Sequence, residues 1–215
     1  MCEFFRVNKK NGNIFVVSLH SGHDLRDEVV KAIKLREDER MREEDPYTDK
    51  LAGAIRGTQI VVNTSRFEVD LNRPKENCVY STPDGAWGLN VWNGNLTGEI
   101  IEGSAKKHDE FYKYLKKLFS DIKGDFIVWD IHSYNLLRRD IRGSDEENPE
   151  INLGTVNNDI KWRDVEDLFV EKMRIKGYDV RKNVKFGGGY LSKWIRQNYR
   201  DRACCLAVDL EKIYL

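Results

Sequence analysis

The sequence predicts an α/β fold of three layers, in which a mixed, mostly parallel sheet carries helices on both faces. Short runs of β-branched and aromatic residues, at 14–19, 126–129 and 204–210, alternate along the chain with segments of helical periodicity. Strands separated by helices favour parallel pairing, because parallel strands need a long crossover connection. The length of 215 residues, against about 150 per domain, predicts a single domain over 1–215.

The first half of the chain is expected to hold two helices between its strands. A helix over 27–44 ends before Pro46, because the residue that precedes a proline disfavours the helical conformation. A shorter helix over 48–56 leads into a strand over 59–63. The segment 66–71 alternates apolar and polar residues and is interpreted as strand-like.

The second half begins with a polar connection and then becomes regular. The stretch 72–102 is rich in Gly, Asn, Pro and Thr and is too broken for a core element. The clearest helix spans 105–122, where apolar residues recur at spacings of three and four. Two more helices, over 165–175 and 190–199, and a strand near 178–180 complete the predicted elements.

Composition and charge exclude several classes of partner. The 36 Lys and Arg residues balance the 36 Asp and Glu residues, so no one-signed field draws the protein to nucleic acid or anionic lipid. The longest apolar run, 203–208, is far shorter than the roughly 20 residues that span a bilayer. The four cysteines include no C-x-x-C pair, and the start lacks a signal-peptide core. We expect a cytoplasmic protein without nucleic-acid or membrane partners, in an oligomeric state that the sequence leaves open.

Three side chains capable of chemistry follow predicted strands. His20, His132 and Glu211 each lie just beyond a strand, and sites in open α/β sheets form at the carboxyl ends of strands. Two imidazoles and a carboxylate at one edge fit a hydrolytic zinc site, because Zn²⁺ favours these ligands and keeps one position for water. His23 is a further candidate, since the pair His20 and His23 has a ligand-like spacing.

Five blocks of sequence surround these residues. They are 65–74 (SRFEVDLNRP), 129–133 (WDIHS), 152–155 (NLGT), 185–189 (KFGGG) and 207–211 (AVDLE). Together the blocks resemble the N-formylglutamate amidohydrolase family, which is related to the zinc carboxypeptidases and aspartoacylases. The first block is highly specific, and with His20 the blocks run in family order over nearly the whole chain. The resemblance implies a fold like that of the zinc carboxypeptidases.

The resemblance also implies a metal site. The first histidine block of the family corresponds to His20, and its acidic block after the first helix corresponds to Asp45, so one Zn²⁺ ion would be bound by His20, Asp45 and His132. His23 remains the alternative third ligand, because the related carboxypeptidases use a glutamate three positions after the first histidine.

Substrate contacts follow from the same similarity. Asn72 and Arg73 would bind a substrate carboxylate, and Arg66 would stabilise the developing oxyanion. Arg66 and Arg73 are seven residues apart, which places them on opposite faces of a regular strand, so both serve one site only if a bend intervenes. Gly188 and Gly189 open a helix and allow close approach of the backbone to an anionic group.

The implied reaction is hydrolysis of the N-formyl or N-acyl amide of a small carboxylate-bearing amino acid, such as N-formylglutamate. Glu211 would act as general base. An N-acetyl amino acid deacylase or a small-peptide zinc carboxypeptidase would use the same machinery and remains an alternative. A non-catalytic module that binds carboxylates is a third possibility, although binding alone needs no general base.

Overall fold

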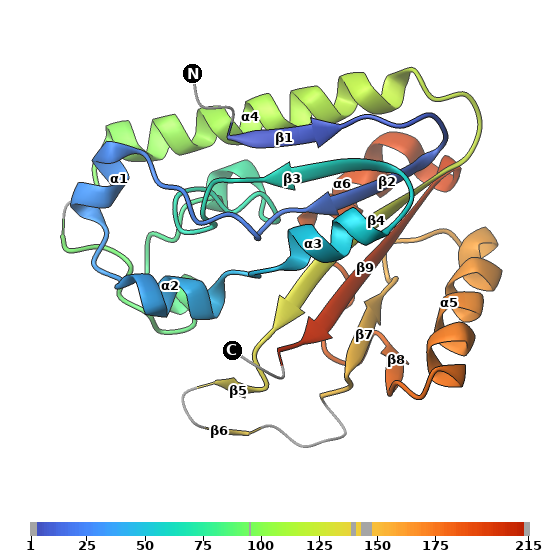
Figure 1. The fold of residues 1–215 in the computed structure, drawn as a ribbon. Coiled ribbons are helices and arrows are strands. Elements are labelled where there is room, and N and C mark those ends of the chain that lie inside the picture. Colours follow the sequence, from blue (N-terminus) through green and yellow to red (C-terminus); the bar gives the residue numbers. More distant parts are fainter. Residues whose placement is uncertain (1–3, 95, 139–140, 143–147, 213–215) are drawn as a thin grey trace.

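A computed structural model describes residues 4–94, 96–138, 141–142 and 148–212 (Figure 1). Within these residues, seven strands form one sheet in the order β1-β3-β2-β4-β9-β7-β8. The strands are β1 (Phe5–Asn8), β2 (Ile14–Ser18), β3 (Thr58–Val62), β4 (Phe126–Tyr134), β7 (Ile151–Gly154), β8 (Val180–Lys182) and β9 (Ala203–Glu211). Two further strands, β5 (Leu137–Arg138) and β6 (Ile141–Arg142), pair with each other outside this sheet.

The sheet is mixed and mostly parallel, as predicted. The neighbours β3, β2, β4 and β9 are all parallel. The strand β1 is antiparallel to β3, and β7 is antiparallel to β9, with β8 parallel to β7. The carboxyl ends of β2, β4 and β9 therefore lie side by side at one edge, which is where the sequence placed the chemistry.

Helices cover both faces of the sheet. They are α1 (Asp27–Ala32), α2 (Glu37–Glu43), α3 (Thr48–Ala54), α4 (Gly98–Ser120), α5 (Arg163–Ile175) and α6 (Tyr190–Tyr199). On one face, Phe15 packs with Leu115 of α4 and Leu191 of α6. On the other face, Val16 belongs to a cluster with α3 and with Val170 of α5. Adjacent strand residues thus point to opposite layers, and the three-layer α/β prediction is confirmed.

The predicted helix over 27–44 is two helices rather than one. The break between α1 and α2 lies at 33–36, where Ile33 forms a β-bridge with Trp92 and Leu35 packs in a cluster around Phe67. These contacts with residues far along the chain outweigh local helical propensity, which is a weak determinant of structure by itself.

The segment 66–71 is a turn and not the predicted strand. The backbone N–H groups of Glu68 and Val69 both donate to the carbonyl of Ser65, and Arg73 N–H donates to the carbonyl of Asp70. Such short-range hydrogen bonds close the chain on itself and exclude strand pairing. In a regular strand Arg66 and Arg73 would lie on opposite faces, and because this segment is a turn, that expectation no longer applies.

Several boundaries also differ from the prediction. The helix α4 begins seven residues earlier than expected, at Gly98, where the Thr97 hydroxyl accepts a hydrogen bond from Ile100 N–H. The strand β4 continues past 126–129 to Tyr134, held by parallel pairing with β9. The strands β1 and β7 were not predicted. No helix in the described part of the chain is long and apolar enough to cross a membrane.

Candidate metal centre and catalytic pocket

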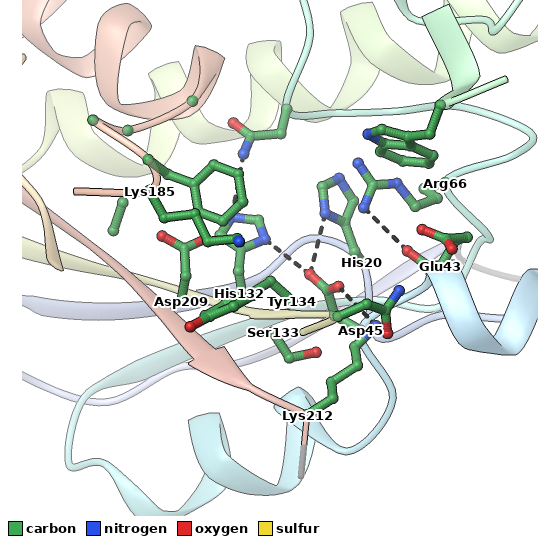
Figure 2. Close-up of a pocket in the computed structure, with 18 residues that line it drawn as sticks. His20, Glu43, Asp45, Arg66, His132, Ser133, Tyr134, Lys185, Asp209 and Lys212 are labelled. Carbon is green, nitrogen blue, oxygen red and sulfur yellow. Dashed lines mark hydrogen bonds and ion pairs between the residues drawn. The ribbon is translucent and has the colours of Figure 1, made fainter. Parts of the chain in front are cut away.

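Three buried side chains meet at the carboxyl edge of the sheet. His20 lies two residues beyond β2, His132 lies in β4, and Asp45 follows α2. The backbone N–H of Asp45 donates to the carbonyl of His20 at 2.9 Å, which fixes the two residues together. One candidate ligand atom from each of the three side chains lies within 4.8 Å of the other two (Figure 2).

The two imidazoles present the same ring nitrogen to Asp45. Oδ2 of Asp45 lies 3.0 Å from Nδ1 of His132 and 3.4 Å from Nδ1 of His20. The opposite nitrogen of each ring faces another buried carboxylate: Nε2 of His20 lies 2.8 Å from Asp70, and Nε2 of His132 lies 2.9 Å from Asp130. Metal-binding histidines are usually oriented in this way, with the second nitrogen held by a carboxylate.

The donor atoms fit a divalent cation. Among the described residues, the buried atoms without a hydrogen bond include Nδ1 of His20 and Oδ1 of Asp45, and both belong to the cluster. Such atoms are rare unless a missing partner satisfies them. Burial disfavours the charged form of Asp45, but the hydrogen bond with His132 and the close approach of His20 lower its pKa well below the ordinary value. The group therefore offers one anionic oxygen and two nitrogens, which suits Zn²⁺.

His23 lies outside this cluster. Its Nδ1 contacts the carboxylate of Glu44, and its Nε2 lies 2.9 Å from Nη2 of Arg40. Both ring nitrogens thus face groups of the α2 region. Of the two alternatives for the third ligand, the structure brings Asp45 and not His23 to the two histidines.

The two arginines occupy different positions. Arg66 lines the cavity beside the histidines, where its Nη2 donates to Asp70 at 2.9 Å and its Nε donates to the hydroxyl of Tyr80 at 2.9 Å. Arg73, which the resemblance placed on the substrate carboxylate, is not among the described residues that line the cavity. Its Nη2 donates to the carbonyl of Gly85 at 2.7 Å, and its guanidinium lies over the Tyr80 ring.

Asn72, Gly188 and Gly189 line the cavity. Nδ2 of Asn72 lies 3.2 Å from Nε2 of His132, and the side-chain oxygen of Asn72 accepts the N–H of Leu191 at the start of α6. A Cβ at Gly189 would lie 2.2 Å from the Asn72 side chain, so this approach requires glycine. Gly188 has a backbone φ of +111°, a conformation that residues other than glycine rarely adopt.

The carboxylate that β9 directs into the cavity is Asp209. Asp209 lies opposite His132 in the register of β9 and β4, and its Oδ2 accepts a hydrogen bond from Asn152 at 3.1 Å. Burial raises its pKa to about 7. Glu211, at the end of β9, is not among the described residues that line the cavity. Strand alternation could have indicated Asp209, because it shares a face with Glu211 and lies deeper in the sheet.

The cavity has a volume of about 380 Å³ and is lined by both charged and aromatic side chains. Its lining includes Glu43, Lys185 and Lys212, which the sequence analysis did not single out. The ammonium of Lys212 donates to the carbonyls of Glu44 and Arg42. It also lies 3.8 Å from Oδ1 of Asp45, so it neutralises part of the negative charge in the cluster.

Comparison with known proteins places the chain in a family. A family model described as N-formylglutamate amidohydrolase matches residues 13–213. The chain is similar to an N-formylglutamate amidohydrolase from Ralstonia eutropha JMP134, at 18% identity and a TM-score of 0.75, over 97% of this chain and 85% of that one. A gene product from Agrobacterium tumefaciens gives 16% identity and a TM-score of 0.67, over 96% and 84% of the two chains. No curated protein matches the chain. The solved structures establish the fold, and the family model shows that the chain belongs to the N-formylglutamate amidohydrolase family.

Proposed function

We propose that this protein is a zinc-dependent amidohydrolase that removes the N-formyl group from a small carboxylate-bearing amino acid such as N-formylglutamate. Family membership supports the reaction. The observation that carries the proposal is the convergence of His20, Asp45 and His132 from three separate stretches of the chain on one buried point. A cavity of about 380 Å³ next to that point suits a small substrate.

One Zn²⁺ ion is the proposed cofactor. Nδ1 of His20, Nδ1 of His132 and a carboxylate oxygen of Asp45 would hold it, and Asp70 and Asp130 would orient the two rings. When bound, such an ion supplies Lewis-acid chemistry, because it acidifies water and polarises an amide carbonyl.

Asp209 is the proposed general base, in place of Glu211. Water attacks the formyl carbon, the C–N bond breaks, and the proton that water releases passes through Asp209 to the departing amine nitrogen, so the products are formate and a free amino acid. The position of Asp209 in the cavity opposite His132 supports this role. A pKa of about 7 suits a group that both accepts and returns a proton near neutrality.

Arg66 is proposed to stabilise the oxyanion of the tetrahedral intermediate. Its guanidinium is fixed by Asp70 and Tyr80, so little reorganisation is needed when negative charge develops. Asn72 and Gly189 would shape the cavity next to the metal ligands. The contacts of Arg73 with the Gly85 carbonyl and the Tyr80 ring favour a structural role over direct binding of substrate.

The proposal is tested by metal analysis followed by assays of product release. Purified protein is loaded with Zn²⁺ and offered N-formyl-L-glutamate, N-acetyl-L-glutamate and a dipeptide with a C-terminal glutamate. Release of formate at the highest kcat/KM supports the proposal. Faster release of acetate, or of the C-terminal amino acid, would establish one of the two alternative hydrolases. Bound metal and ligand-induced stabilisation without any turnover would establish a binding module.

A further inference from the structure

We propose that Lys185 binds the side-chain carboxylate of the substrate and thereby makes the pocket selective for dicarboxylic over monocarboxylic amino acid derivatives. This inference rests on the proposed function and assigns a role to Lys185, the first residue of the 185–189 block, to which the sequence analysis gave none. The argument starts from the positive charges around the cavity.

Among the described residues, the lysines and arginines that line the cavity are Arg66, Lys185 and Lys212. The ammonium of Lys212 is directed at two backbone carbonyls, and its side chain is only 4% exposed. Lys212 therefore neutralises the protein's own carboxylate rather than a substrate's.

Arg66 lies on the side of the metal cluster. One carboxylate, Asp70, contacts both Arg66 and His20, so the guanidinium is held close to the reacting centre. In Figure 2, Arg66 and Lys185 lie on opposite sides of the two histidines. If the substrate amide binds at the histidines with its carbonyl oxygen near Arg66, the side chain of the substrate extends the other way, toward Lys185.

The position of Lys185 is built into the fold. Its backbone N–H donates to Oδ1 of Asn152 at 3.0 Å, and Asn152 is completely buried. The same side chain donates to the proposed base, Asp209, at 3.1 Å. One buried amide therefore sets the distance between the lysine and the catalytic edge of the sheet, as expected of a preorganised binding site.

The side chain of Lys185 is also held. Its ammonium lies 4.7 Å from the centroid of the Tyr134 ring and donates to Oδ1 of Asn148. Ordering the lysine before the substrate arrives lowers the entropic cost of binding. The positive charge of Lys185 matters because Glu43 and Asp209 also line the cavity. These acidic side chains disfavour a substrate side-chain carboxylate unless a cation faces it.

The test compares two substrates of nearly equal size. N-formyl-L-glutamate carries the second carboxylate, and N-formyl-L-glutamine replaces it with a neutral amide. We expect the wild-type protein to prefer the first in kcat/KM. Lys185→Gln should reduce that preference by about 10- to 100-fold, mainly through KM, because it removes one charge-assisted hydrogen bond. Lys185→Arg should retain most of the preference.

Two controls distinguish this role from a structural one. Lys182→Gln removes a nearby lysine that binds Asp167 on α5, and it should leave the preference unchanged. Thermal unfolding of Lys185→Gln should match that of the wild type. An unchanged ratio in folded Lys185→Gln would overturn the inference.

Binding of the products separates this inference from the proposed function. L-glutamate and L-glutamine are titrated into the zinc-loaded protein by calorimetry. If neither formyl substrate is hydrolysed but Lys185→Gln abolishes a preference for glutamate, the proposed function fails and the inference stands. If formate is released while the glutamate preference ignores the substitution, the inference fails and the proposed function stands.

Discussion

Nε2 of His20 lies 2.8 Å from Oδ1 of Asp70, and the other oxygen of that carboxylate accepts a hydrogen bond from Arg66 at 2.9 Å. Asp70 is fully buried, and its contacts with Arg66 and His20 lower its pKa well below the ordinary value despite the cost of burial. One side chain thus orients a candidate metal ligand and a candidate oxyanion donor together. Substitution of Asp70 itself should affect both functions.

Asp70→Asn should weaken zinc binding by about 10- to 100-fold, the usual effect of losing a carboxylate that orients a metal-binding histidine. Competition with a chromophoric chelator measures the affinity. Asp109→Asn is the matched control, because Asp109 is an exposed acid that pairs with Lys75 and does not belong to the candidate ligand cluster. Equal affinities for the Asp70 variant and the wild type would show that Asp70 does not orient His20.

Asp209→Asn should lower kcat by about 10² to 10⁴-fold, because it removes the proposed proton acceptor while keeping the shape of the side chain. Glu211→Gln should retain most of the activity, since Asp209 is the acid of β9 that lines the cavity. Steady-state rates of formate release at saturating substrate decide between them. A large loss in Glu211→Gln with near-normal Asp209→Asn would return the base to Glu211.

The stability of the metal-free protein should depend on pH through Asp209. Burial raises its pKa from 3.8 to about 7, so the folded protein keeps a proton that the unfolded chain releases at lower pH. The stabilisation from this group is fully present below about pH 4 and is lost as pH rises through 7. Asp209→Asn lacks the group and should gain stability relative to the wild type over that range. Urea unfolding at several pH values in the presence of chelator measures the difference, and a difference that does not vary with pH would contradict the raised pKa.

Arg66→Met should lower kcat by about 10²- to 10³-fold, the range for loss of an oxyanion donor. Arg73→Met should leave kcat within a few-fold of the wild type. It should lower thermal stability instead, because the guanidinium of Arg73 packs on the Tyr80 ring and donates to the carbonyl of Gly85. Kinetics and thermal unfolding of both variants provide the test. The reverse pattern would restore Arg73 as the substrate-binding residue that the resemblance implied.

Gly189→Ala should destabilise the protein by about 1–3 kcal/mol, because the new Cβ would lie 2.2 Å from an Asn72 side chain that is fixed by Leu191. Gly53→Ala is the control, since Gly53 lies in the helix α3 and a Cβ there meets nothing within 4 Å. That substitution should stabilise by roughly 0.5–1 kcal/mol. Denaturant unfolding measures both, and equal stability of Gly189→Ala would show that Asn72 moves freely.

The central part of the fold could be predicted because local pattern and tertiary structure agree there. Apolar strand runs such as 126–129 and the periodic helix at 105–122 are buried on the faces that their spacing indicates. Prediction failed where distant contacts decide. The break at Ile33 depends on Trp92, and β7 exists through antiparallel pairing with β9, more than 50 residues later.

The candidate site shows the same division. The motifs identified His20, Asp45 and His132, which the structure brings together. They also indicated Arg73 and Glu211, which are not among the described residues that line the cavity. Arg73 follows the turn at 66–71, and Asp209, on the same face of β9 as Glu211, lies deeper in the sheet. Lys185 begins the 185–189 block, but a lysine in a motif indicates no role until its position relative to the site is known.

Metal stoichiometry in the ligand variants tests the central claim most directly. Elemental analysis of the wild-type protein after zinc loading and dialysis should give one equivalent per chain. His20→Ala, Asp45→Ala and His132→Ala should each bind far less, with matching loss of formate release and a folded circular dichroism spectrum. Retention of one equivalent of zinc by these folded variants, or full turnover by chelator-treated wild type, would contradict the account.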